Sequence, residues 1–159
     1  MTLEETMIKM TFDRWNALLK QFNTALESLT DEQLQHEISP GRNRGIYLLG
    51  HLTAVHDSMV TLLDLGERLY PEMQEIFINK PDKSVPEIPS AADLRQKWQH
   101  VGNVLDEAFA NMQPSDWFQK HTAVTAEDFA GEPYRNKLNI IVTRASHLAY
   151  HLGQFILIK

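Results

Sequence analysis

The chain has 159 residues, 43% of them hydrophobic, which is enough for one domain with a substantial buried core. Its formal net charge of −6 argues against nucleic acid or an anionic membrane surface as a partner, and leaves small molecules and other proteins. It has no cysteine, no leader-like segment and no apolar run of the roughly 20 residues that span a bilayer, so we expect a soluble cytoplasmic protein without disulfides or thiolate ligands.

Apolar residues recur at helical spacing through almost the whole chain, and no segment alternates with the period of two that strands show. We therefore predict an all-α fold. Thr2 and Glu5 have the spacing of a capping box and mark a first long helix, and Thr30 and Gln33 repeat that spacing before a short helical turn that ends near residues 39–41. The apolar stripe of the first long helix consists of Ile8, Phe12, Trp15, Leu18, Leu19, Phe22, Leu26 and Leu29.

A second long helix is expected from about residue 46 to about residue 65, after a loop at 41–45. Residues 66–90 contain four prolines, and such a long, proline-rich segment is typical of a surface connection that crosses over between the helices of a bundle. The packing side of the second helix is formed by Leu48, Leu52, Val55, Met59, Leu62 and Leu63.

Ser90 begins a third capping signature and predicts a third long helix, which runs to Pro114. A polar, irregular stretch then leads to the last helix, expected from Tyr134 or Arg135 to the end of the chain. Four long helices with a long crossover between the second and third describe a four-helix bundle. We assign the whole chain, 1–159, to that single domain.

His147 and His151 are four residues apart on the last helix. At that spacing both imidazoles project from neighbouring turns of one face and can reach a single metal ion. A third ligand is available on the second helix from either His51 or His56, and helical geometry alone does not choose between them. Three histidines would leave coordination positions free for water or a substrate atom. Ordinary solvated histidines are expected in the polar and loop contexts of His36, His100 and His121.

The chain lacks the sequence signatures of several common catalytic sites. It contains no H-E-x-x-H, E-x-x-H or G-x-S-x-G, no P-loop and no dinucleotide fingerprint. A zinc-protease site and a carboxylate-bridged di-iron site are therefore not expected. On their helices, neither Asp57 nor Tyr150 is directed toward the candidate ligands, so we assign no catalytic acid or base.

The sequence resembles the DinB or YfiT-like superfamily at Gly50-His51-Leu52, at the proline-rich crossover and at His147-x-x-x-His151-Leu-Gly-Gln154. Helix order and loop lengths extend the resemblance over the whole chain. It implies an up-down-down-up four-helix bundle, commonly a homodimer, with a divalent metal, zinc or nickel, held by three histidines. Carried over by position, the metal ligands are His51, His147 and His151, and Gln154 lies near the site.

The resemblance also implies a reaction class, because characterised members include thiol S-transferases and thiol-dependent isomerases. A bound divalent metal lowers the pKa of a coordinated small thiol and so supplies a thiolate at neutral pH, which suits a chain without cysteine. We expect a metal-dependent enzyme that transfers a small thiol to an electrophilic small molecule. Two alternatives are a hydrolase that activates water at the same open site and a non-catalytic dimeric bundle that serves as an interaction or metal-binding module.

Overall fold

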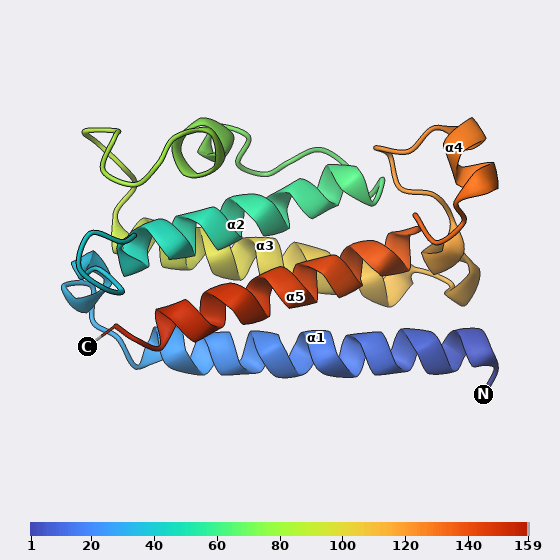
Figure 1. Cartoon of the computed structure of the whole chain (residues 1–159). Coiled ribbons are helices and arrows are strands. Elements are labelled where there is room, and N and C mark those ends of the chain that lie inside the picture. Colours follow the sequence, from blue (N-terminus) through green and yellow to red (C-terminus); the bar gives the residue numbers. More distant parts are fainter. Residues whose placement is uncertain (159) are drawn as a thin grey trace.

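The computed structural model describes residues 1–158, and its regular parts are helical (Figure 1). Within these residues, the helices of 18 residues or more are α1 (Leu3–Glu27), α2 (Gly45–Leu62), α3 (Ala91–Asn111) and α5 (Lys137–Phe155). The described part of the chain contains isolated bridges but no β-strand, so the predicted all-α class is confirmed.

The helix starts that carry a capping signature in the sequence are the ones the prediction placed best. The Glu5 backbone N–H donates to Thr2 Oγ1 at 3.1 Å and the Thr2 N–H donates to Glu5 Oε2 at 2.7 Å, which closes the predicted capping box of α1. Thr30 and Gln33 exchange the same pair of bonds ahead of the short 3₁₀ helix η1 (Gln33–Gln35). At α3, the Ser90 hydroxyl accepts from the N–H of residue 93.

The second long helix ends three residues earlier than predicted, at Leu62 instead of about 65. The reason lies in the backbone: Asp64 has a φ of 61° and terminates the helix in the left-handed conformation. The Leu65 N–H donates to the Val60 carbonyl at 2.8 Å and the Asp64 N–H to the Thr61 carbonyl at 3.1 Å, which is the bond pair of a Schellman motif.

The crossover between α2 and α3 is more ordered and more deeply packed than a surface connection. It contains a π-helical turn, η2 (Glu75–Asn79), which the sequence analysis missed, and its Met73 and Phe77 are completely buried. Asp57 of α2, only 1% exposed, accepts hydrogen bonds from the N–H groups of Leu69 and Tyr70 at 2.8 and 3.0 Å. This buried carboxylate therefore fastens the start of the crossover to α2.

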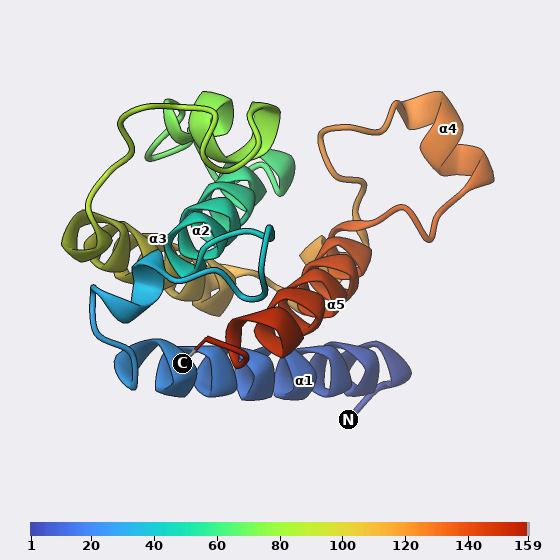
Figure 2. The ribbon, with the colours of Figure 1, turned by 60° about the vertical axis from the view of Figure 1, so that its left-hand side comes forward.

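The stretch expected to be irregular before the last helix contains two short helices, η3 (Pro114–Phe118) and α4 (Ala126–Gly131). Thr125 caps α4 by accepting from the Asp128 N–H at 3.0 Å, a signature that was present in the sequence. Figures 1 and 2 both show α4 standing apart from the long helices. It buries none of its residues, so it adds no surface to the core.

The last helix begins at Lys137, later than predicted, because Asn136 is its N-cap and accepts from the Asn139 N–H at 3.0 Å. The helix ends at Phe155 and not at the chain end: Leu157 and Ile158 donate to carbonyls three residues back, which tightens the chain into a turn. The predicted final residue of the helix, 159, lies outside the described residues.

The long helices pack so that α1 lies along α5 and α2 lies along α3, while α2 also contacts α5. Their apolar stripes form one core together with residues of η1, η3 and the crossover, and this core includes all of the tryptophans. The crossover covers the remaining side of α2, so 13 of its 18 residues are buried (Figure 2). Polar side chains on such a helix require partners inside the protein, because water does not reach them.

Candidate metal centre

Three histidines meet between α2 and α5. His51 projects from α2, and His147 and His151 project from successive turns of α5. Their ligand nitrogens all lie within 4.8 Å of one another. The Nε2 atom of His147 is 3.2 Å from that of His51 and 3.1 Å from that of His151. Among the described residues, no other group of histidine and carboxylate side chains has this arrangement.

The spacing of these nitrogens fits a single metal ion. Imidazole nitrogens bind zinc at about 2.0–2.1 Å, which places neighbouring ligand nitrogens about 2.9–3.4 Å apart in octahedral or tetrahedral geometry. The observed 3.1 and 3.2 Å fall within that range. The three histidines are therefore positioned to bind a metal ion on one side and leave the other coordination positions to non-protein ligands.

Hydrogen bonds at the opposite ring nitrogens orient two of the three imidazoles. His51 Nδ1 donates to the carbonyl oxygen of Phe77 at 2.8 Å, and His151 Nδ1 lies 2.8 Å from Gln154 Oε1. A ring that carries its proton on Nδ1 presents the lone pair of Nε2, and this is the tautomer needed for ligation through Nε2. Gln154 thus lies at the site, as the sequence analysis expected.

A glycine makes the contact between Phe77 and α2 possible. A Cβ atom built on Gly50 would overlap the Phe77 ring, far inside van der Waals contact. Because Gly50 has no side chain, the Phe77 ring packs directly on the helix, and its carbonyl reaches the adjacent His51. The hydrogen-bond partner of His51 therefore lies in the crossover. In the sequence, Gly50 was the one sign of this close contact.

Burial keeps the imidazoles neutral. Desolvation, together with the neighbouring His151, His51 and Arg144, lowers the pKa of His147 to about 4. Desolvation also lowers the pKa of His51 and of His151, although their hydrogen bonds to Phe77 and Gln154 oppose the shift. Near pH 7 all three are therefore in the neutral form, which is the form that binds a metal.

The alternative third ligand, His56, faces a different part of the molecule. Its ring lies between two indoles, with centroids 5.0 Å from Trp15 of α1 and 4.8 Å from Trp98 of α3. It is 2% exposed and does not join the cluster that contains His51. Of the histidines expected to be solvated, His100 lies 2.7 Å from the Tyr70 hydroxyl, and the cluster includes none of the three.

The described residues offer no carboxylate to this cluster. Asp57 accepts hydrogen bonds from the crossover backbone, and Tyr150 is 63% exposed, with its ring edge-to-face against His151 at a centroid distance of 5.0 Å. The donor set thus consists of neutral nitrogens, and no side chain stands out as a general acid or base. The sequence analysis did not single out Arg144, which lies one helical turn before His147. Its position three residues before a candidate ligand could have indicated that it belongs near the site.

In class, this is an all-α protein whose second and fifth α-helices bring three imidazoles together in positions that could bind a metal ion. The chain belongs to the DinB superfamily, whose family model matches residues 14–155. A comparison with curated proteins found no match. Within the described residues, no helix combines the length and apolarity needed to cross a bilayer.

Proposed function

We propose that this protein is a divalent-metal-dependent enzyme in which His51, His147 and His151 hold a zinc or nickel ion. The observation that carries the proposal is that His147 Nε2 lies at ligand spacing from the Nε2 atoms of both His51 and His151, with all three ligand nitrogens within 4.8 Å of one another. Membership of the DinB superfamily supports it.

The reaction we propose is the transfer of a small thiol to an electrophilic small molecule. A zinc or nickel ion at this site supplies a thiolate at neutral pH by lowering the pKa of a coordinated thiol. The chain's own part is to orient the ligand rings, through Phe77 and Gln154, and to keep them neutral by burial. Because the sequence has no cysteine, the sulfur comes from a co-substrate.

Metal content tests the site directly. Protein purified without a histidine tag is expected to contain about one divalent ion per chain by mass spectrometry, and the His147→Ala/His151→Ala variant to contain none. The matched control is His36→Ala/His100→Ala, which removes two histidines outside the cluster and keeps the ion. Equal metal content in parent and His147→Ala/His151→Ala would reject the site.

Transfer is tested with a panel of small thiols and a chromogenic electrophile. The metal-loaded parent is expected to form the thioether faster than the metal-free protein, and the double histidine variant to match the metal-free rate. Water without thiol is the control for hydrolysis. A rate that needs the metal but no thiol would identify a hydrolase, and no metal-dependent rate with any substrate would identify a non-catalytic bundle.

The same proposal includes an up-down-down-up order of the long helices, a homodimeric assembly and a cytoplasmic location. The helix order is supported by the long segment 63–90, which can return the chain to the end where α2 began. The homodimeric assembly is supported by a mostly apolar groove between α1 and α5. Its lining includes Met10, Leu18, Val142, Ala145 and Ala149, together with Arg14.

A further inference from the structure

Arg144 is a cation without a partner in the interior of the bundle. It lies on α5 one turn before His147, its side chain is half-buried, and its Nε is completely buried. It makes neither a hydrogen bond nor an ion pair with any residue that the structure describes. Other arginines are paired: Arg44 with Asp82 at 2.7 Å, and Arg95 with Asp31 at 3.0 Å.

The guanidinium of Arg144 lies beside the three-histidine cluster. Arg144 lies three residues before His147 on α5, and its positive charge contributes to lowering the pKa of His51, His147 and His56. On the helical wheel of α5, residue 144 falls between the buried stripe and the face that carries His147 and His151. Arg144 is therefore directed into the space where α2 and α5 meet.

The neighbouring side chains leave further nitrogens without partners. Trp15 Nε1, His56 Nε2 and His147 Nδ1 are buried and make no hydrogen bond to a described residue. Trp15 and His56 are in ring contact, and the charges of Arg144 and His147 both act on His56, so these four side chains form one neighbourhood.

These nitrogens are mostly hydrogen-bond donors. Trp15 Nε1 and Arg144 Nε can only donate, and His147 Nδ1 carries the ring proton when Nε2 is the metal ligand. The nearest buried carboxylate of α2, Asp57, is fully used by the backbone of residues 69 and 70. A half-buried positive charge beside several buried donors and no acceptor favours the binding of a negatively charged acceptor.

We propose that Arg144 is the recognition group for a small carboxylate that binds beside the metal centre, so that an organic acid is a substrate of the reaction. A guanidinium presents two parallel N–H groups that match the two oxygens of a carboxylate. The substrate assignment rests on the proposed function, whereas binding of the carboxylate to Arg144 does not require the metal.

The test compares propionate with its neutral isostere propionamide at constant ionic strength, on metal-free and zinc-loaded protein. Tryptophan fluorescence is the readout, because Trp15 borders the neighbourhood, and the thermal midpoint is the second readout. Propionate is expected to bind the parent saturably and raise its midpoint, with at least tenfold preference over propionamide. Arg144→Lys is expected to weaken propionate about tenfold, and Arg144→Met to abolish its binding.

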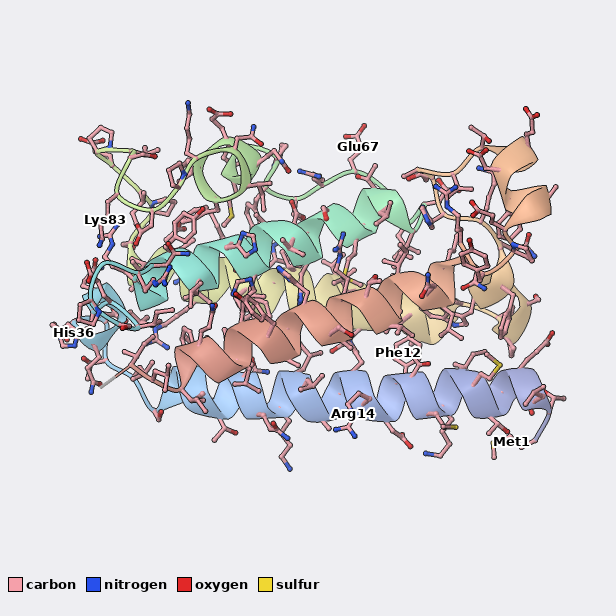
Figure 3. All side chains as sticks on the ribbon, in the orientation of Figure 1. Met1, Phe12, Arg14, His36, Glu67 and Lys83 are labelled. Carbon is pink, nitrogen blue, oxygen red and sulfur yellow. The ribbon has the colours of Figure 1, made fainter. Side chains whose placement is uncertain are left out.

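Arg14→Met is the matched control, since Arg14 is an exposed arginine of α1 that lines the groove with α5 and is not part of the neighbourhood of Arg144 (Figure 3). It is expected to bind propionate as the parent does. Arg144→Met removes a half-buried charge that has no partner among the described residues and is expected to fold about as stably as the parent. If Arg144→Met does not fold, the expected tenfold loss of propionate affinity in Arg144→Lys tests the carboxylate site.

Equal binding of propionate and propionamide, or parental propionate affinity in the Arg144 variants, overturns the carboxylate site. Metal content measured on the same samples tests the proposed function separately, because propionate binding is measured on the metal-free protein and does not depend on the metal. With zinc bound, 3-mercaptopropionate is the last probe. If 3-mercaptopropionate binds at least tenfold more tightly than propionate, the carboxylate that Arg144 recognises belongs to the thiol co-substrate. If the two affinities are equal, the carboxylate belongs to the second substrate.

Discussion

His51 shows how one ligand depends on residues far from it in the sequence. Its ring is held by the carbonyl of Phe77, and that carbonyl is held in place because Gly50 lets the Phe77 ring lie against α2. The Tyr47 hydroxyl adds a second tie to the same segment by donating to the Lys80 carbonyl at 2.7 Å. Metal ligands with such outer partners lose affinity when the partner moves.

Gly50→Ala tests this arrangement. The new methyl group displaces the Phe77 ring and with it the carbonyl that binds His51 Nδ1. We expect zinc affinity to fall about 10–100-fold and the free energy of unfolding to fall by about 1–3 kcal/mol. Competition with a chromogenic chelator measures the first quantity, and urea denaturation measures the second.

Gly102→Ala is the control for that experiment, because a Cβ atom at Gly102 in α3 meets no atom within 4 Å. It is expected to leave zinc affinity unchanged and to stabilise the protein by about 0.5–1 kcal/mol, as alanine does in a helix interior. If Gly50→Ala retained parental zinc affinity, the Phe77 carbonyl would have no part in holding His51.

At the scale of the helices, the sequence predicted starts better than ends. Thr2 and Ser90 were recognised because an N-cap oxygen and its acceptor N–H are only three residues apart. The end of α2 was missed because Asp64, not glycine, adopts the left-handed conformation there. The turn η2 was missed because prolines surround it and tertiary packing of Phe77 stabilises it.

His56 connects three helices, since its ring lies between Trp15 of α1 and Trp98 of α3. Complete burial, followed by the charges of Arg144 and His147, lowers its pKa from 6.5 to about 3. The folded protein therefore keeps this ring neutral between pH 3 and 6.5, whereas the unfolded chain protonates it. Because the unfolded state binds more protons, stability decreases as the pH falls below 6.5.

His56→Phe removes this proton uptake while keeping an aromatic ring between the two indoles. Between pH 7 and pH 5, the metal-free parent is expected to lose about 2 kcal/mol more of its unfolding free energy than the variant does. Urea denaturation at a series of pH values measures the difference. Parallel stability curves for the two proteins would show that His56 stays neutral in the unfolded chain or is charged in the fold. Metal content is the control, and it is expected to be equal because His56 lies outside the cluster.

For the whole molecule, the surface between α1 and α5 is the place where the proposed homodimer is best tested. Met10 and Val142 are 68% and 45% exposed there, next to the apolar groove. Exposed apolar side chains that gather over two helices are typical of an interface.

Val142→Arg adds a second positive charge to the groove, which Arg14 also lines. Sedimentation velocity is expected to show a dimer for the parent and a monomer for the variant, with equal metal content, because Val142 is not on the histidine face of α5. Asn111→Arg adds the same charge at an exposed position at the end of α3 and is expected to remain a dimer. A dimeric Val142→Arg variant would place the interface on another face of the bundle, and a monomeric parent would refute the dimer.

The sequence by itself determined what depends on neighbours a few residues apart. Helical periodicity predicted the long helices, and the spacing of four residues predicted that His147 and His151 share a face. Tertiary structure decided what depends on distant segments. It decided that His51, 96 residues from His147, meets it while His56 packs between two tryptophans, and that the half-buried Arg144 has no carboxylate partner among the described residues. The physical reason is that rotation and crossing of whole helices set these contacts, and they follow from packing of the entire core rather than from any local spacing.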